Sequence, residues 1–112
     1  MCNKRESLEI QKEAYMLCFE LLKEKLVDCY LYGSYARGDY HKYSDVDIMI
    51  VVDMDYEQIS KLRNNIGIIN SDLSLKHDVT VSVKLQPLEM LQSYSDLPFY
   101  KNVMTEGIKY GE

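Results

Sequence analysis

Residues 33–52, GSYARGDYHKYSDVDIMIVV, decide the fold of this chain of 112 residues. The stretch begins with a Gly-Ser turn, continues through a polar loop, and ends with Ser-Asp-Val-Asp directly before an apolar run. Alternate side chains of a β-strand point to the same face, so Asp45 and Asp47 project together while Val46 and Ile48 turn the other way. The pattern is typical of a buried strand that presents two carboxylates at its start.

The composition of this stretch predicts a metal site beside a phosphate site. Two adjacent carboxylates repel each other, and Mg²⁺, which prefers oxygen ligands, commonly binds one or two carboxylates together with substrate phosphates. Gly33 permits a tight turn, and the residues after it can begin a short helix whose free N–H groups face an anion. The Ser34 hydroxyl and the Arg37 guanidinium can add a hydrogen bond and a positive charge.

Each half of the stretch also has an ordinary structural interpretation. An Asp-x-Asp pair at the start of a strand is most often a solvated edge, and Gly-Ser is most often a simple turn. Here the two halves occur together, with residues 35–44 between Ser34 and Asp45, and the pair leads into an apolar strand. The combination favours a functional site over two coincidental features.

With Gly33-Ser34, ten intervening residues and Asp45-Val46-Asp47, the chain resembles the DNA polymerase β-like nucleotidyltransferase superfamily. The Gly-Ser-Tyr-Ala-Arg-Gly-Asp version of the motif and the short chain are similar to the minimal nucleotidyltransferases, the MNT proteins of HEPN–MNT toxin–antitoxin pairs. The resemblance implies an α/β (α+β) nucleotidyltransferase fold, with a small mixed β-sheet and helices packed mainly on one side. The order of predicted helices and strands agrees with it, and we expect a single domain over residues 1–112.

The resemblance also implies a third carboxylate on a later strand, and Asp78 is the candidate in this sequence. In residues 77–83, HDVTVSV, Asp78, Thr80 and Ser82 alternate with valines, which predicts a half-buried strand. The alternative for Asp78 is an ordinary exposed strand residue. The candidate catalytic and metal-binding residues are Asp45, Asp47 and Asp78, and the candidate nucleotide-binding residues are Gly33, Ser34, Arg37 and Ser44.

The chemistry implied is nucleotide transfer. Asp45 and Asp47 are expected to hold Mg²⁺ against the triphosphate of ATP, and Asp78 to share a second Mg²⁺ or to act as general base. Arg37 is expected to neutralise charge on the triphosphate or on the acceptor. ATP enters through the resemblance, because the sequence contains no motif that reads a base.

The acceptor is the harder question. Larger relatives, such as antibiotic-modifying nucleotidyltransferases, carry additional helical domains that build an acceptor pocket, so here we expect the acceptor to be another protein. In MNT relatives it is a HEPN ribonuclease toxin, which is silenced by adenylylation of a tyrosine. Two alternatives stay open: an antitoxin that neutralises its toxin by binding alone, and a nucleotidyltransferase that acts on a small molecule.

Bulk properties limit the classes of partner. A formal net charge of −5 argues against direct binding to nucleic acid backbones, which depends on arrays of Lys and Arg. No apolar run approaches the ~20 residues that cross a membrane, and no signal peptide is visible, so we expect a cytoplasmic protein. Cys2, Cys18 and Cys29 are expected to be reduced, with the latter two as small core residues.

Hydrophobic periodicity predicts the remaining elements. A helix is expected over residues 6–26, followed by a strand over 27–32. The apolar stripe of this helix is predicted to be Tyr15, Phe19, Leu22 and Leu26.

In the second half of the chain, a helix-capping pattern and two prolines predict where helices begin. Asp55 and Gln58 form a capping-box pattern that starts a second helix, which is expected to reach Asn70 and to be followed by a loop over residues 71–76. Two short helices are expected to begin near Pro87 and Pro98, and the glycines after them predict a fraying C-terminus.

Overall fold

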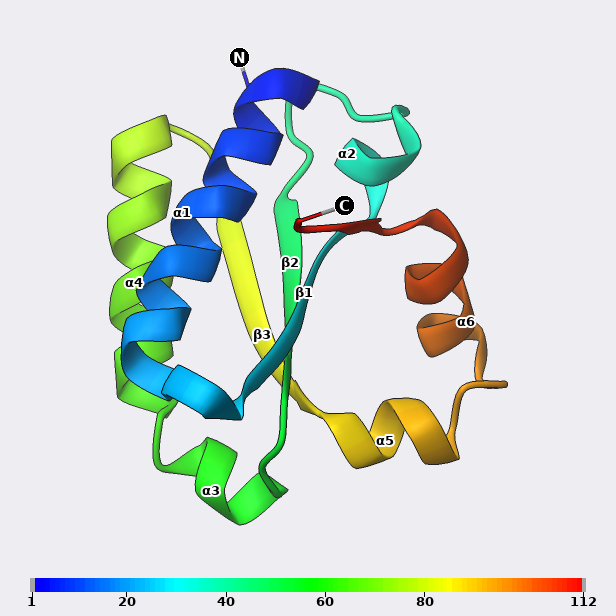
Figure 1. The fold of residues 1–112 in the computed structure, drawn as a ribbon. Helices are drawn as coiled ribbons and strands as arrows, with labels where there is room; N and C mark the ends of the chain where they lie inside the picture. The colour runs from blue at the N-terminus through cyan, green and yellow to red at the C-terminus, as the bar shows by residue number, and fades with distance from the viewer. Residues whose placement is uncertain (1, 112) are drawn as a thin grey trace.

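The computed structural model describes residues 2–111, and four strands in it form one mixed sheet (Figure 1). The sheet order is β3-β2-β1-β4, with β1 at Leu26–Tyr32, β2 at Val46–Val52, β3 at Val81–Pro87 and β4 at Ile108–Lys109. Strand β1 is antiparallel to both β2 and β4, whereas β2 and β3 are parallel. The predicted fold class, a small mixed sheet with helices, is confirmed.

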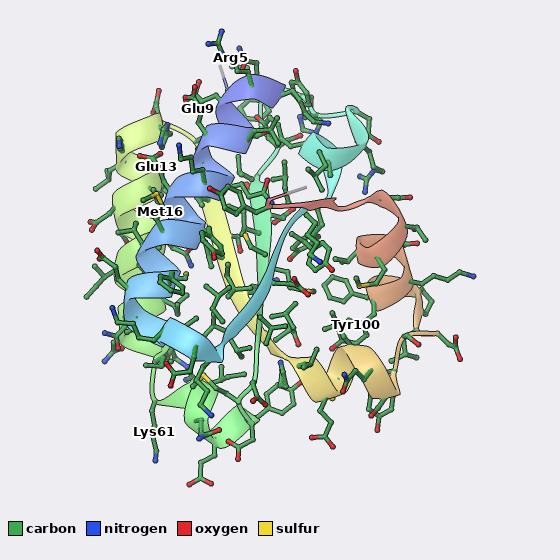
Figure 2. All side chains as sticks on the ribbon, viewed as in Figure 1. Arg5, Glu9, Glu13, Met16, Lys61 and Tyr100 are labelled. Carbon is green, nitrogen blue, oxygen red and sulfur yellow. The ribbon has the colours of Figure 1, made fainter. Side chains whose placement is uncertain are left out.

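Helices cover both faces of the sheet, but unequally. The larger apolar cluster lies between one face and the two long helices, α1 (Lys4–Leu22) and α4 (Arg63–His77). A smaller cluster lies on the other face, beneath α5 (Leu88–Ser93) and α6 (Pro98–Glu106). Figure 2 shows Tyr100 of α6 directed toward this second face, where it is buried. The face that α5 and α6 only partly cover is the one that carries Asp47.

Strand β2 lies in the middle of the sheet, and Asp47 is its one polar residue. Val46, Ile48 and Ile50 pack in the larger cluster, and Met49 packs in the smaller one. A strand covered on both faces requires an almost continuous apolar sequence, which is what residues 48–52 provide. The predicted separation of Asp47 from Val46 and Ile48 onto opposite faces is therefore confirmed.

The first helix is shorter than predicted. Asn3 caps its start by accepting a hydrogen bond from the Glu6 N–H, and the helix ends at Leu22. Lys23 then adopts a φ of 54°, and a 3₁₀ turn, η1 (Lys23–Lys25), leads into β1 at Leu26. The predicted extension of the helix to Leu26 is wrong, because that residue begins the strand.

The predicted apolar stripe of α1 is correct at Leu22 and in part at Tyr15, which is half-buried against the core, but wrong at Phe19 and Leu26. The stripe that faces the core is made of smaller side chains at a spacing of four, Ile10, Ala14, Cys18 and Leu22. Phe19 is 45% exposed and stacks on Tyr15, which in turn stacks on Tyr110.

The cysteines behave as predicted. Cys18 and Cys29 are both fully buried in the larger cluster. Burial raises the pKa of each thiol to about 12, so both remain protonated at neutral pH. All three cysteines are free thiols.

The predicted capping box is confirmed, but the helix that follows it differs from the prediction. Asp55 and Gln58 bond reciprocally at the start of α3 (Tyr56–Ser60), and α4 follows after a short turn. Residues 71–76, predicted as a loop, belong to α4. Leu73 is buried in the core, and Lys76 and His77 form ion pairs with α1, so tertiary contacts extend this helix.

The strand predicted to begin before Asp78 begins at Val81 instead. Asp78 is the C-cap of α4 and adopts the left-handed conformation, with φ 52° and ψ 45°. A left-handed residue is a common way to end a helix, and Asp tolerates this conformation better than most residues. The placement of Asp78 on a strand face with Thr80 and Ser82 is therefore wrong.

The C-terminal segment also differs from the prediction. The two short helices predicted near Pro87 and Pro98 are present as α5 and α6. Directly after Gly107, where fraying was predicted, Ile108–Lys109 form β4 beside β1. The side-chain amide of buried Gln11 in α1 donates to the Ile108 carbonyl at 2.7 Å and to the Cys29 carbonyl at 3.4 Å, and so joins both strands to the helix.

Within residues 2–111, no helix has the length and apolar character that spanning a membrane requires.

We expect Gln11→Ala to lower the free energy of unfolding by about 1–3 kcal/mol, because it removes the two hydrogen bonds that the buried Gln11 amide donates to the Ile108 and Cys29 carbonyls. Urea unfolding measures this loss, and hydrogen exchange at the Tyr110 amide, which donates to the Cys29 carbonyl, reports the loosening of β4. Lys12→Ala, at the exposed neighbouring position, is the control and should change neither quantity. An unchanged exchange rate in Gln11→Ala would show that β4 does not depend on this amide.

Candidate active site

The centre of the site is a close contact between Gly33 and Asp47. Tyr32, the last residue of β1, pairs with Asp47 in the sheet, and Gly33 follows with a φ of 78°. A Cβ atom at Gly33 would lie 2.7 Å from the Asp47 Oδ2 atom, closer than side chains tolerate. The glycine therefore serves two purposes, since it permits the turn and leaves room for the carboxylate.

The two carboxylates of the motif destabilise each other. Asp47 is half-buried and Asp45 is exposed just before β2. Burial raises the pKa of Asp47, and the negative charge of Asp45 raises it further, against the opposing positive charges of Lys84 and Arg37. A pair of carboxylate oxygens in this state fits a hard divalent cation such as Mg²⁺, which removes the repulsion and takes oxygen ligands. Asp45 and Asp47 are thus the residues that would hold the metal.

Asp78 lies on the Asp45 side of this pair of carboxylates. It is exposed at the end of α4 and lines, together with Asp45, Ser44 and Thr80, a hollow of about 360 Å³. Within residues 2–111, no three His, Cys, Asp or Glu side chains are grouped so that they could hold a metal ion. The structure places Asp78 near Asp45 without joining the three carboxylates, and its role as a third ligand stays a prediction.

The short helix predicted after Gly33 is present as α2 (Ser34–Arg37), a single helical turn with Gly33 as its N-cap. The Gly33 carbonyl accepts hydrogen bonds from the N–H groups of Ala36 and Arg37, both at 3.1 Å. The N–H groups of Ser34 and Tyr35 precede these and are the ones that the start of a helix leaves for a ligand. Ser34 is the first residue of α2, directly after Gly33, which lies beside Asp47.

Arg37 is held at the end of α2 by two carboxylates. Its Nε atom lies 3.2 Å from Asp39 Oδ2, and its Nη1 atom lies 3.6 Å from Glu106 Oε2 at the end of α6. The side chain is exposed, and the pairs raise the pKa of its guanidinium, chiefly through the hydrogen bond to Asp39. Arg37 joins α2 to α6 and adds positive charge near Asp47.

Ser44, which was predicted to bind the nucleotide, has a structural role in the loop before β2. It is buried, and its hydroxyl accepts a hydrogen bond from the His41 N–H at 2.9 Å, which closes the turn before β2. Ser44 therefore shapes the loop that presents Asp45. Its contact with a nucleotide stays a prediction, although it lines the same hollow as Asp45.

Residues near the N-terminus hold the loop in place, which the sequence did not indicate. Tyr35 is buried, stacks on Tyr40 with ring centroids 4.4 Å apart, and donates from its hydroxyl to the Cys2 carbonyl. The Lys4 ammonium donates to the Ala36 carbonyl at 3.0 Å. Tyrosines of the motif therefore support the loop as packing residues.

Sequence reasoning also missed the residues that surround Asp47 on its face of the sheet. Ser82 pairs with Asp47 across β2 and β3, and Lys84 is two residues further along the same face. Tyr32 lies on the other side, where burial and the charge of Asp47 raise the pKa of its hydroxyl to about 12. Ser82 and Lys84 alternate with buried residues, which shows that they share one face of β3. The sequence does not show that this face lies beside Asp47, because that depends on the parallel register of β2 and β3.

A second hollow, of about 220 Å³, opens beside Gly33. Phe99 of α6 meets Tyr32 edge-on, with ring centroids 5.7 Å apart. The hollow is lined by Tyr32, Gly33, Arg37, Phe99, Asn102, Val103 and Glu106. The carboxylate pair is thus flanked by one polar hollow at Asp45 and one aromatic hollow at Gly33.

The sequence of this chain is similar to those of known proteins. The family described as "Nucleotidyltransferase domain" matches residues 16–109. Two proteins of Methanocaldococcus jannaschii are similar: "Putative protein adenylyltransferase MJ0604" is 36% identical over 77 residues, which are 69% of this chain and 70% of that protein. "Putative protein adenylyltransferase MJ0141" is 38% identical over 93 residues, which are 81% of this chain and 90% of that protein.

Solved structures share the fold. A structure described as "Crystal structure of the toxin-antitoxin with AMP-PNP" matches with a TM-score of 0.52 and 22% identity, covering 88% of this chain and 70% of the other. A mutant of the toxin-antitoxin MntA-HpeT matches with a TM-score of 0.52 and 21% identity, over the same shares of the two chains. The predicted nucleotidyltransferase fold is confirmed.

We expect Gly33→Ala and Gly38→Ala to differ in their effect on the site. Both glycines have positive φ, so each replacement strains the backbone at a cost of about 1–3 kcal/mol. Only Gly33→Ala also displaces the Asp47 carboxylate, because an added Cβ at Gly38 meets nothing within 4 Å. Thermal unfolding with and without Mg²⁺ and ATP should show a retained ligand-induced shift in Gly38→Ala and none in Gly33→Ala; equal shifts would contradict the contact.

We expect Asp47→Asn to stabilise the protein against unfolding at pH 7 in the absence of divalent cations. The pKa of Asp47 is raised in the folded state, so its charged form costs stability above that pKa, and the cost disappears below the ordinary carboxyl pKa. The stability gap between variant and wild type should therefore close as the pH falls to about 4. Thermal unfolding at both pH values measures it, and a gap that widens toward acid would have the wrong sign.

Proposed function

Because the chain belongs to the nucleotidyltransferase domain family, we propose that it transfers AMP from ATP to a tyrosine hydroxyl of a HEPN ribonuclease toxin and thereby neutralises that toxin. Two relatives at 36% and 38% identity carry the description of a putative protein adenylyltransferase, which supports a protein as acceptor. The fold is shared with a toxin–antitoxin structure that contains AMP-PNP, an analogue of ATP, which supports ATP as donor.

One observation carries this proposal: the Asp47 carboxylate, which the charge of Asp45 repels, stands directly beside the Gly33 turn at the start of α2. Carboxylates that repel each other at the end of a turn with free N–H groups are suited to a metal-bound triphosphate. Mg²⁺ bound there would offset the charge of the triphosphate and lower the pKa of the acceptor hydroxyl.

In the proposed reaction the acceptor oxygen forms a bond to the α-phosphorus of ATP, and the bond from that phosphorus to the bridging oxygen breaks. The hydroxyl proton goes to a base or to solvent, and pyrophosphate leaves. The N–H groups and hydroxyl at Ser34 would hold the phosphates that depart, while the Arg37 guanidinium would offset their charge. Asp45 and Asp47 would position the α-phosphate, and Asp78 would act from the Asp45 hollow on the acceptor side.

We expect Asp45→Ala/Asp47→Ala to abolish AMP transfer while leaving the fold intact, because both ligands of the phosphate-bound metal are lost. The measurement incubates the purified protein with Mg²⁺, α-labelled ATP and an extract of its own host, and follows label on protein. The double variant Asp72→Ala/Asp96→Ala removes the same charge from exposed positions and should label as wild type does.

The other outcomes separate the alternatives. Retained transfer in Asp45→Ala/Asp47→Ala would exclude this active site. A partner that binds the wild type without becoming labelled favours an antitoxin that acts by binding alone. Label on a non-protein product favours transfer to a small molecule.

A further inference from the structure

The strand beside Asp47 offers the site a hydroxyl and a cation. Ser82 of β3 pairs with Asp47, and Lys84, in register with Met49, lies two residues further along on the same face of the sheet. The strand itself, VSVKLQP, contains no Asp or Glu, and Asp78 lies outside it as the cap of α4. Ser82 and Lys84 are therefore the polar side chains of β3 nearest to Asp47.

Lys84 lies close enough to reach the space in front of Asp47. Neighbouring strands are about 4.8 Å apart and residues two apart along a strand about 6.6 Å, so the two Cα atoms lie about 8 Å apart. Long side chains bridge such a diagonal gap. Burial and the charge of Asp45 raise the pKa of Asp47, and the charge of Lys84 is the larger of the two that oppose them.

The ammonium group of Lys84 is open to a ligand. Its side chain is exposed on β3, and the ion pairs among residues 2–111 do not include it. Arg37, the other cation that acts on Asp47, is held by Asp39 and Glu106. Lys84 is thus the cation beside Asp47 whose charge no ion pair within the described residues occupies.

Arg37 and Lys84 stand on opposite sides of Asp47. Strand β2 lies between β1 and β3, and Gly33 and α2 follow directly from β1 (Figure 1). In the proposed reaction, pyrophosphate departs toward Ser34 and Arg37, on the β1 side. The attacking and leaving oxygens of a phosphoryl transfer lie roughly in line. The acceptor oxygen therefore approaches from the β3 side, where Lys84 lies.

We propose that Lys84 is a catalytic residue of the acceptor side, whose ammonium binds the acceptor oxygen and stabilises it as a phenolate, so that the site selects tyrosine over serine and threonine. A positive charge next to a phenol favours its ionised form. The tyrosine hydroxyl has an ordinary pKa of about 10, and each lowering of that pKa by one raises the ionised fraction at pH 7 about tenfold. The inference rests on the proposed function, because it names the residue that selects the acceptor of that reaction.

Lys84 neither gives nor takes a proton in this step. The tyrosine O–H bond breaks, its proton leaves to solvent, and the electron pair stays on the oxygen. That pair forms the bond to the α-phosphorus of ATP, and the pair of the bond to the bridging oxygen leaves with pyrophosphate. The ammonium donates a hydrogen bond to the acceptor oxygen while that oxygen is negative, and it is unchanged at the end.

Three variants isolate the charge of Lys84. Lys84→Met removes the charge and keeps an unbranched side chain at an exposed strand position, whereas Lys84→Arg keeps the charge. Lys101→Met removes the same charge from the exposed surface of α6 and is the matched control.

The experiment supplies each protein with Mg²⁺, α-labelled ATP and a desalted extract of its host, and measures the initial rate of labelling of protein at pH 7 and at pH 9. At pH 7 we expect Lys84→Met to be slower than wild type by roughly tenfold or more, equally at low and at saturating ATP. The difference should narrow at pH 9, where more of a phenol ionises unaided. Lys84→Arg should keep most of the activity and Lys101→Met all of it, and mass spectrometry should place the AMP on tyrosine.

The thermal shift that ATP and Mg²⁺ induce separates this role from one in donor binding. Lys84→Met should keep the shift at pH 7, because the donor phosphates are held on the β1 side. A lost shift, an equal deficit at both pH values, wild-type transfer by Lys84→Met, or AMP on serine or threonine would each overturn the role of Lys84 and leave AMP transfer to protein standing. If wild type labels no protein, the proposed function fails and this inference fails with it.

Discussion

The contact between Asp47 and Gly33 is the constraint on which the rest of the structure depends. Asp47 stands in a central, buried strand, and its carboxylate occupies the space that any side chain at Gly33 would need. The antiparallel pairing of β1 with β2 sets this contact, because Tyr32 lies opposite Asp47 and the chain must turn immediately afterwards. A side chain at Gly33 would therefore force the Asp47 carboxylate to shift.

The surrounding packing keeps an unfavourable pair of charges in place. Asp45 and Asp47 repel each other, and burial of Asp47 adds to the cost. Apolar packing on both faces of β2 fixes the strand, and the buried Tyr35 holds α2 against the N-terminal residues. A bound cation would relieve this repulsion without any rearrangement of the fold, which is how a preorganised site gains affinity.

What could be predicted from the sequence was local. The side-by-side carboxylates follow from strand alternation, and the capping box of Asp55 and Gln58 follows from a pattern of four residues. The errors came from distant partners. His77 is ion-paired with α1, which prolongs α4 and makes Asp78 its cap, and Gln11 bonds a carbonyl of β4 from the opposite end of the chain. The alternation after Asp78 looks the same whether the strand begins there or at Val81, so sequence alone could not locate the third carboxylate.

The displacement of Asp78 bears on the kind of acceptor that suits this site. On the strand beside Asp47, the positions that face the site carry Ser82 and Lys84, a hydroxyl and a cation, in place of a carboxylate. If β3 offers no carboxylate to take the proton of the acceptor, an acceptor hydroxyl that ionises readily is favoured. The phenol of tyrosine, with an ordinary pKa of about 10, ionises far more readily than an aliphatic alcohol, and Lys84 would stabilise the developing phenolate. The chemistry of the β3 face would thus suit the tyrosine acceptor proposed above.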